Sequence, residues 1–421
     1  MSIEQSDIVV GLAFGDEGKG TIVDYLASQK DKVNSVVRFS GGAQAAHNVI
    51  TANGLHHTFA QLGSASFMGV RTILSRFVLV DVFSLVNEAN SFYDQTGFDA
   101  LNVALLSENA LLTTPIHAAI NKKREILRGK DAHGSCGMGV GETQSYKNIA
   151  GWKAPTLADL NNLPTLFVKL DYLLDYALAE VGEIRDLIPS IDDIKHSYYN
   201  LSDDNILNIV SDEIISKELA KGYNIFEGSQ GALLDEDLGF HPNTTWSTVT
   251  QKNAQTLLEE AKLPKGRTIG VTRSYTTRHG AGAFPSEFED DSWVTSYPEN
   301  HNKKEIFQGA WRAGDLDIPL LNYGARANGG VDAVAVTHLD ISVNKVAVSY
   351  DSFEEVPTGY FDKDRTQQEA FSQTLAIAGT GKHLKSIDGE DELIALIEEA
   401  CSAPCIIRSY GPTWLDKLPL R

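Results

Sequence analysis

The sequence predicts an α/β protein with a mostly parallel central β-sheet, built as a single large domain. Short apolar, β-branched runs alternate with helical patterns along the chain. A chain of 421 residues can bury a large core. Neither an internal repeat nor a linker-like segment divides it. These observations together favour one domain that carries insertions.

The chain opens on a strand–loop–helix unit. Residues 7–14 (DIVVGLAF) form an apolar run typical of a buried strand, and residues 21–28 (TIVDYLAS) have helical periodicity. Further strands are expected at residues 33–39, 71–80, 101–106, 222–227, 268–272, 331–339 and 345–350, with helices at 116–128 and 166–181. Residues 155–219 are polar, acidic and helical, which predicts a peripheral helical subdomain over a sheet edge.

The charge balance limits the partners. Lys and Arg number 36 against 56 Asp and Glu, a formal charge of −20, which disfavours nucleic acid because a phosphate backbone is repelled. A small anion can still bind where backbone N–H groups converge. No run of about 18 apolar residues predicts a membrane span. The acidic first residues do not resemble a secretory signal, and 3 cysteines are too few for a disulfide scaffold, so a cytoplasmic location is expected.

The strongest motif is Gly15–Gly20 (GDEGKG), directly after the first predicted strand. Its glycines let the backbone approach an anion, and the following helix start supplies unpaired N–H groups. Lys19 can reach a phosphate, and Asp16 can hold Mg²⁺ or accept a proton. The loop is not a Walker A motif, because Ala13 and Gly20 stand at the places of its first Gly and its Ser/Thr. The alternative is an acidic glycine turn, but we favour a P-loop-like phosphate site.

Three further segments carry polar side chains among small residues. Residues 40–47 (SGGAQAAH) follow a predicted strand, and His47 beside a phosphate loop favours an acid or electrostatic role over a structural one. Residues 134–141 (GSCGMGVG) fit a phosphate contact no better than a flexible surface loop. Residues 227–235 (EGSQGALLD) suit a base edge or a phosphate, with a capped helix start as the equal alternative.

Taken in order, these four segments resemble the adenylosuccinate synthetase family. The resemblance continues at residues 275–287 (YTTRHGAGAFPSE), 337–340 (THLD) and 409–412 (SYGP), and it extends from Val9 to Pro412. Seven colinear segments are far more specific than any one of them.

The resemblance implies a ligase that joins L-aspartate to C6 of a 6-oxopurine nucleoside monophosphate, with a nucleoside triphosphate as co-substrate and Mg²⁺. The γ-phosphoryl passes to O6, and the aspartate amine then displaces it. Asp16 matches the base that takes the N1 proton, and Lys19 and His47 match groups that stabilise the transferring phosphoryl. The carboxylate of Asp16 and the carbonyl of Ala46 match the metal oxygens, and a homodimer is expected.

Other positions match the family's nucleotide and aspartate contacts. Gln44, the Ser135/Cys136 loop and Thr245 match contacts to the 5′-phosphate, and Gln230 matches the contact to the purine edge. Arg312 matches an arginine that pairs an aspartate carboxylate. The full set of nucleotide-binding residues implied is Gly15, Glu17, Gly18, Gly20, Gln44, Ser135, Cys136, Gln230, Thr245, His338, Asp340, Ser409 and Gly411.

The chain also departs from the family pattern. Residues 147–150 (KNIA) lack the arginine lent by a neighbouring subunit, and residues 307–314 (FQGAWRAG) keep only Arg312 of an arginine-rich aspartate loop. His338 replaces a lysine of the guanine-reading segment, so ATP or dATP becomes a candidate donor beside GTP. These changes resemble the archaeal and phage-encoded branch, which includes dGMP synthases. Asp16 points the other way, because a smaller residue there makes room for a 2-amino group.

On balance the sequence interpretation leans to GMP or dGMP as the acceptor, with IMP and GTP, the ordinary pair, as the alternative. Two readings from other classes are a P-loop-like GTPase or kinase and an inactive nucleotide-binding homologue. The absent Walker Ser/Thr argues against the first, and the presence of Asp16, Lys19 and His47 argues against the second.

Overall fold

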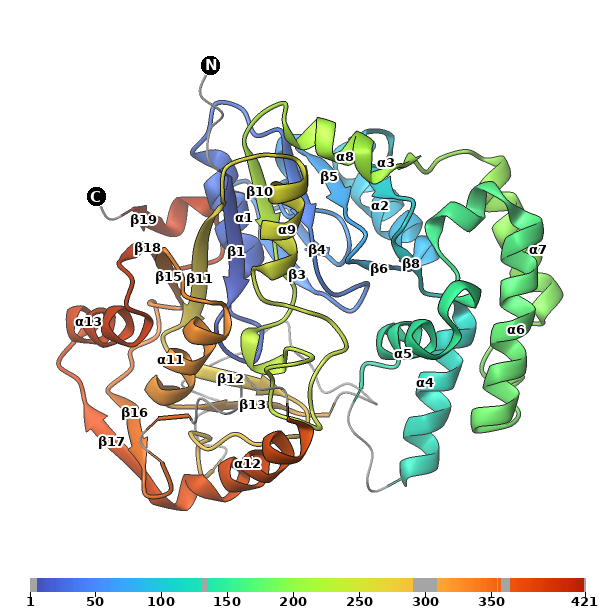
Figure 1. The fold of residues 1–421 in the computed structure, drawn as a ribbon. Helices are drawn as coiled ribbons and strands as arrows, with labels where there is room; N and C mark the ends of the chain where they lie inside the picture. Colours follow the sequence, from blue (N-terminus) through green and yellow to red (C-terminus); the bar gives the residue numbers. More distant parts are fainter. Residues whose placement is uncertain (1–5, 130–134, 291–308, 354, 357–363, 420–421) are drawn as a thin grey trace.

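The structure is a computed structural model that describes residues 6–129, 135–290, 309–353, 355–356 and 364–419. A ten-stranded sheet runs through it in the order β19-β18-β15-β11-β1-β10-β2-β5-β7-β9 (Figure 1). Neighbouring strands are parallel except for the pair β18–β19 at one edge. The strands are β1 (Asp7–Gly11), β2 (Ser35–Arg38), β5 (Arg71–Leu74), β7 (Leu105–Ser107), β9 (Ile209–Val210), β10 (Asn224–Glu227), β11 (Arg267–Arg273), β15 (Ala333–Thr337), β18 (Cys405–Ser409) and β19 (Lys417–Pro419). The predicted α/β class with a mostly parallel sheet is confirmed.

Helices cover both faces of the sheet, and β1 shows why its sequence is an unbroken apolar run. Ile8 and Val10 belong to a core shared with α8 (Asp212–Leu219), α9 (Lys252–Glu260), α11 (Ile318–Ala327) and α13 (Glu390–Cys401). Val9, which points to the opposite face, packs with α1 (Lys19–Ser28). A strand buried on both faces needs apolar residues at every position, and all five residues of β1 are buried.

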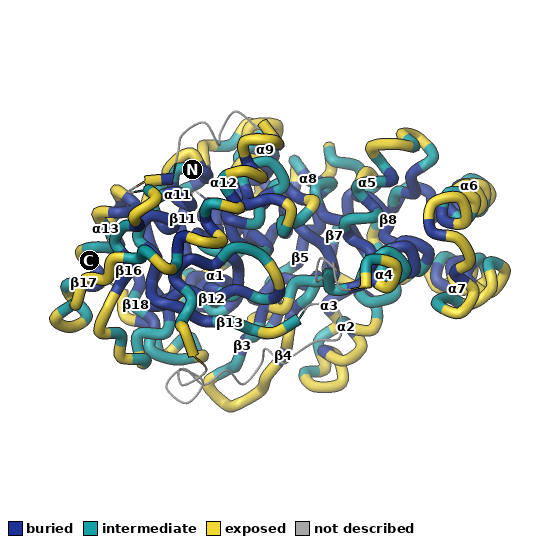
Figure 2. The backbone as a smooth tube through the Cα atoms, turned by 90° about the horizontal axis from the view of Figure 1, so that it is seen from below, coloured by how far each residue is buried: buried dark blue, intermediate teal, exposed yellow. Residues whose placement is uncertain are grey.

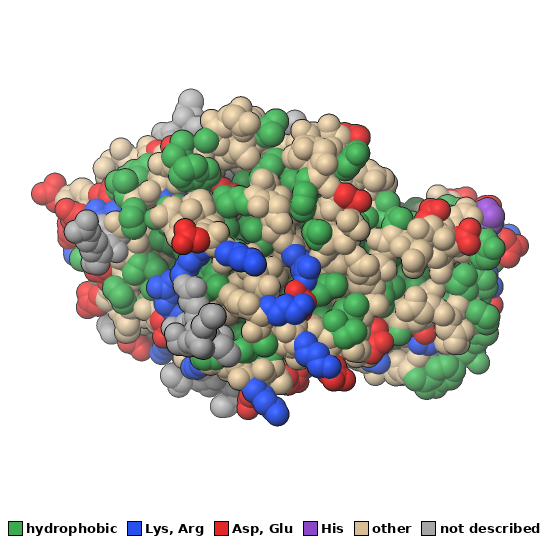
Figure 3. All heavy atoms as spheres, turned by 90° about the horizontal axis from the view of Figure 1, so that it is seen from above, with side chains coloured by type: hydrophobic (Ala, Val, Ile, Leu, Met, Phe, Trp, Pro, Cys, Tyr) green, Lys and Arg blue, Asp and Glu red, His purple; other side chains and the backbone are tan. Residues whose placement is uncertain are grey.

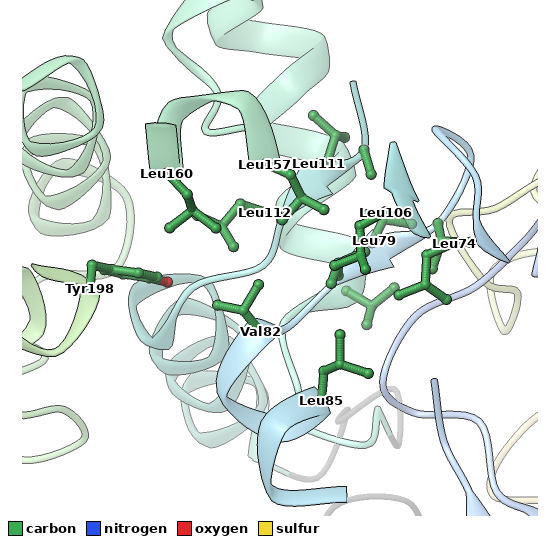
Figure 4. Packing of buried hydrophobic residues seen from close by; sticks show 14 of the residues in the cluster. Leu74, Leu79, Val82, Leu85, Leu106, Leu111, Leu112, Leu157, Leu160 and Tyr198 are labelled. Carbon is green, nitrogen blue, oxygen red and sulfur yellow. The ribbon is translucent and has the colours of Figure 1, made fainter. Parts of the chain in front are cut away.

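A helical lobe extends from the β9 end of the sheet. It contains α2 (Val82–Thr96), α4 (Pro115–Arg128), α5 (Val140–Ala150), α6 (Leu163–Val181) and α7 (Ile191–Asp203), and Figures 1 and 2 show α4, α6 and α7 at this end. Its core includes Leu74, Leu106, Leu157 and Tyr198 (Figure 4). Residues 155–219 are largely helical as predicted and add the edge strand β9; their status as a separate subdomain stays a prediction.

Three strand predictions are corrected. Residues 71–80 form two strands, β5 and β6 (Leu79–Val80), which belong to different sheets because the chain turns at residues 75–78. Residues 101–106 do not form one strand, because Asp99 caps a short helix α3 (Ala100–Val103) by accepting a bond from Asn102 N before β7 begins. Residues 345–350 do form a strand, β16 (Lys345–Tyr350), but it pairs with β14 (Leu316–Asp317) and β17 (Lys382–Ser386) in a separate sheet. Within the described residues, no helix combines the length and apolarity needed to cross a bilayer.

The amino ends of the strands lie on the face seen from above, where Lys and Arg side chains gather near the middle (Figure 3). A hollow of 630 Å³ there is lined by Lys30, Lys32, Arg71 and Lys221 among others. Arg71 and Lys221 both pair with Glu218. The predicted site residues lie at the opposite, carboxyl ends of the strands.

Candidate active site

Three loops at the carboxyl ends of the parallel strands hold non-glycine residues in the left-handed region. Asp16 follows β1 with φ +58°, Gln230 follows β10 with φ +54°, and His338 follows β15 with φ +58°. Such backbone strain concentrates at functional sites. This is also the edge where open α/β sheets bind ligands. The loops touch, since a Cβ at Gly231 would lie 2.2 Å from the carbonyl oxygen of Ala13.

Glu17 gives the predicted phosphate loop its shape. Its Oε1 accepts hydrogen bonds from Ala13 N at 3.0 Å and Gly15 N at 2.9 Å, and its Oε2 accepts one from Lys19 Nζ at 2.6 Å. The carboxylate is therefore an internal anchor of the loop, and the nucleotide contact of Glu17 stays a prediction. Thr337 Oγ1 donates to the Glu17 carbonyl at 2.8 Å and so ties the loop to the end of β15.

The start of α1 is prepared for an anion. Gly18 caps the helix with φ +84°, and no side chain bonds to its first N–H groups. Free N–H groups and the positive end of the helix dipole together attract a phosphate. Gly20 lies in the first turn, where a Cβ would lie 2.8 Å from the Cβ of His47. The glycine therefore lets the predicted histidine pack directly on the phosphate loop.

Asp16 lies among cations. Arg273 Nε donates to the Asp16 carbonyl at 2.5 Å. Burial raises the pKa of the Asp16 carboxyl, while the charges of Arg273 and His279 act in the opposite direction. A carboxylate whose pKa is raised is a stronger proton acceptor, so the environment suits a general base.

His47 is held by a carboxylate that the sequence analysis did not single out. Its Nδ1 lies 2.5 Å from Glu227 Oε1, and Ser64 N donates to Glu227 Oε2 at 3.0 Å. Burial disfavours ionised Glu227, but the charges of His47 and Arg38 lower its pKa to about 2. Glu227 is the first residue of the fourth motif and ends a buried strand, which is the signal that points to it.

Two amides flank the glycines of the second motif. A Cβ at Gly41 would lie 3.1 Å from Gln230 Oε1, and one at Gly42 would lie 3.1 Å from Gln44 Oε1. Both side-chain oxygens are buried and have no hydrogen-bond partner. A buried unpaired polar atom costs about 1–3 kcal/mol, so these amides fit a polar ligand between them.

The third motif lies beside this pair. A Cβ at Gly42 would also lie 3.2 Å from Val140 Cγ2 at the start of α5, whose N-cap Gly139 donates its N–H to Asn121 Oδ1 at 3.3 Å. Ser135 Oγ accepts from Asn121 Nδ2 at 2.8 Å, and burial raises the pKa of Cys136. Gly134 lies outside the described residues. Ala46 is exposed just before β3 (His47–Ile50), and Thr245 N donates to the Leu234 carbonyl at 2.8 Å.

The predicted motifs lie together at the carboxyl ends of the strands, and a comparison with known families agrees with their resemblance. The adenylosuccinate synthetase family profile matches residues 8–415. The chain belongs to that family.

Relatives named as adenylosuccinate synthetases match this chain along nearly all of their length. Adenylosuccinate synthetase from Buchnera aphidicola subsp. Schizaphis graminum is 31% identical, with 98% of each chain covered. The enzyme from Chlorobium phaeobacteroides is 27% identical, with 97% of this chain and 96% of the relative covered. As a member of the adenylosuccinate synthetase family, the protein is a ligase that forms C–N bonds.

Solved structures share the fold. Fully ligated adenylosuccinate synthetase from Plasmodium falciparum superposes with a TM-score of 0.83 at 23% identity, covering 99% of this chain and 100% of that one. The cyanophage S-2L succinoaminodeoxyadenylate synthetase, bound to dGMP and dATP, gives 0.61 at 16% identity, covering 99% and 95%.

In this adenylosuccinate synthetase family member, the segment predicted to read the triphosphate base lies beside another segment predicted to bind nucleotide. Leu339 N donates to the Ser409 carbonyl at 3.0 Å, which brings the His338–Asp340 segment beside Ser409–Gly411. Burial holds the pKa of His338 well below its ordinary value. Lys417, absent from the sequence prediction, donates to the carbonyls of Gly411 and Thr413 at 2.8 Å each.

The predicted aspartate ligand Arg312 is hydrogen-bonded within its own loop. Its Nε donates to Glu287 Oε1 at 2.7 Å, Nη1 donates to the carbonyls of Gly280 and Gly282 at 3.0 Å each, and Nη2 bonds the second oxygen of Glu287. These bonds brace the loop, and the role of Arg312 as an aspartate ligand stays a prediction. Phe307 and Gln308 of the same predicted loop lie outside the described residues.

Proposed function

We propose that this ligase joins L-aspartate to C6 of a 6-oxopurine nucleoside monophosphate, driven by a nucleoside triphosphate. One observation carries the proposal: His47 packs on Gly20 in the same loop that presents Asp16 and Lys19. A base for the purine N1 proton and the donors for a transferring phosphoryl group therefore lie within one loop and its neighbour. A protein that only bound nucleotides would not need the base.

In the first step, Asp16 accepts the N1 proton of the purine while O6 attacks the γ-phosphorus and the nucleoside diphosphate leaves. Charge on the transferring phosphoryl is met by the free N–H groups of α1, by Lys19 and by His47. Because Nδ1 of His47 is engaged with Glu227, its Nε2 is the nitrogen that meets the phosphoryl oxygen. Lys19 exchanges its contact with Glu17 for a phosphate in this step.

In the second step, the aspartate amine attacks C6, the C6–O6 bond breaks, and inorganic phosphate leaves. Nε2–H of His47 stabilises the departing phosphate, and a proton of the amine is lost to solvent. Gln44 and Gln230, whose buried Oε1 atoms lack a partner, contact the nucleoside monophosphate in the proposal. Ser135, Cys136 and Thr245 complete its 5′-phosphate site in the proposal.

The residues present fit Mg²⁺. The described residues contain no group of three or more His, Cys, Asp and Glu able to hold a metal by themselves. Mg²⁺ in phosphoryl-transfer sites takes one or two carboxylates together with substrate phosphates. Asp16 and the carbonyl of Ala46 would hold it, and it would neutralise charge on the phosphates.

Two observations favour IMP as the acceptor, in contrast to the lean of the sequence interpretation. Asp16 is a full-sized carboxylate next to two cations, which leaves less room for a purine 2-amino group than a smaller residue would. The relatives of near-full length are named adenylosuccinate synthetases. GMP or dGMP is the second candidate, favoured by the missing arginines around residues 147–150 and 309–314; the ligands of the cyanophage protein, dGMP and dATP, form the second pair to test.

A turnover assay with Mg²⁺ and aspartate tests the class and the substrates together. IMP, GMP and dGMP are crossed with GTP, ATP and dATP, and released phosphate is measured with and without aspartate. Phosphate release that needs both aspartate and one monophosphate supports the ligase. Hydrolysis without a monophosphate would indicate a GTPase-like protein, and nucleotide binding without release would indicate an inactive homologue. Light scattering of the same sample tests the expected homodimer.

A further inference from the structure

Strands β12 (Thr276–His279) and β13 (Trp311–Gly314) form a two-stranded ribbon beneath the central sheet (Figure 1). The register pairs Arg278 with Arg312 and His279 with Trp311. Directly opposite residues in an antiparallel pair share one face, and successive residues alternate between faces. The two arginines therefore point to one face of the ribbon, while His279 and Trp311 point to the other.

Both arginines on this face of the ribbon are hydrogen-bonded within the protein. Arg312 is held by Glu287 and two loop carbonyls, as described above. Arg278 donates to the carbonyls of Ala281, Ala283 and Asn243 and is almost fully buried over the ring of Phe14. These bonds stabilise the turn after β12.

The other face borders Asp16. The ring of Trp311 lies 6.0 Å from the guanidinium of Arg273, and Arg273 Nε holds the Asp16 carbonyl. His279 is close enough for its charge to lower the pKa of the Asp16 carboxyl. Its Nε2 is buried and has no hydrogen-bond partner. An unpaired buried ring nitrogen beside the proposed base indicates a polar contact that the substrates complete.

We propose that Nε2–H of His279 donates a hydrogen bond to a carboxylate of L-aspartate as it approaches C6. This inference rests on the proposed function. Lys19, His47 and the start of α1 already serve the phosphoryl group, and Asp16 faces the purine N1. Aspartate is the one reactant left that brings negative charge to this point, and an imidazole N–H is a suitable donor to it. His279 thereby contacts aspartate in addition to Arg312, whose carboxylate role stays a prediction.

The test compares His279→Gln with His279→Leu and His279→Asn. The amide nitrogen of glutamine reaches the place of Nε2, whereas leucine has no donor and the amide of asparagine stops at the place of Nδ1. We expect KM for aspartate to rise at least about 10-fold in the Leu and Asn variants, which corresponds to about 1.4 kcal/mol, and less than about 3-fold in the Gln variant. KM for both nucleotides should stay within about twofold of wild type. His383→Leu, on the exposed strand β17, is the matched control.

The outcomes separate the two proposals. A KM for aspartate that is unchanged in both the Leu and the Asn variant overturns the role of His279 while wild-type turnover leaves the ligase proposal standing. An equal rise in KM for the nucleotides overturns it as well, because it indicates general damage to the loop. Should His279→Leu fail to fold, the asparagine variant decides. Wild-type protein without aspartate-dependent phosphate release overturns the proposed function and this inference with it.

Discussion

Glu227 Oε1 lies 2.5 Å from His47 Nδ1, and the two residues are 180 positions apart in the chain. Glu227 ends β10, the strand between β1 and β2, and its other oxygen is held by Ser64 N. Glu227 accepts the Nδ1 proton, and its charge acts against the burial that lowers the pKa of His47, so it favours the imidazolium in which Nε2 also carries a proton. Nε2 is then the nitrogen presented to a ligand, so Glu227 acts as a positioning residue for His47.

Glu227→Gln is therefore expected to lower kcat by about 10- to 100-fold, since it keeps an acceptor for Nδ1 but removes the charge that favours a cationic imidazole. KM for aspartate should change little. Steady-state kinetics across pH provide the measurement, because the variant should also shift the acidic limb of kcat. Ser64→Ala, which removes only a hydroxyl contact to Glu227, serves as the control and should lose far less. A variant with wild-type kcat and pH profile would show that the contact is purely structural.

Asp16→Asn is expected to lower kcat by about 10²- to 10⁴-fold, the usual contribution of a positioned general base. Asparagine tolerates the left-handed backbone of residue 16 better than most side chains, so the loop should keep its shape. Rapid-quench kinetics measure the loss of turnover, and calorimetry measures whether the loop still binds the triphosphate. Retention of most of the wild-type kcat would contradict the assignment of the base.

The features that could be predicted from the sequence are those formed by residues close together in the chain. The phosphate loop could be identified because Asp16, Lys19 and the glycines lie within a few residues of one another, directly after a buried strand. The partners of Arg312 and His47 could not be predicted. Glu287 and Glu227 lie far from them in the sequence and come close only when the strands pair. The placement of His279 on the face opposite Arg312 likewise follows from strand pairing, which a linear motif does not contain.

Glu17→Ala is expected to destabilise the protein by about 1–3 kcal/mol, because the buried N–H groups of Ala13 and Gly15 lose their acceptor. Since those bonds shape the phosphate loop, KM for the triphosphate should rise on the order of 10-fold, or about 1.4 kcal/mol. Thermal denaturation and steady-state kinetics measure the two changes. Glu17→Gln keeps an acceptor oxygen, so it should recover most of the stability. Equal losses in both variants would mean that the ion pair with Lys19, and not the loop bonds, carries the effect.

Lys417→Met tests how the loop that contains Gly411 and Thr413 contributes to triphosphate binding. It also predicts a specific dependence of stability on pH. Lys417 Nζ holds the carbonyls of Gly411 and Thr413, so its removal should raise KM for the triphosphate about 10-fold and leave KM for the monophosphate unchanged. Burial lowers the pKa of Lys417 to about 8 from 10.5. The folded state therefore loses the proton near pH 8 while the unfolded state keeps it to pH 10.5, so this group makes the wild type gain stability across that window. Denaturant titrations at pH 7, 8, 9 and 10 should show that gain relative to Lys417→Met. Parallel stability curves for the two proteins would place Lys417 in contact with solvent, in conflict with its position beneath Gly411.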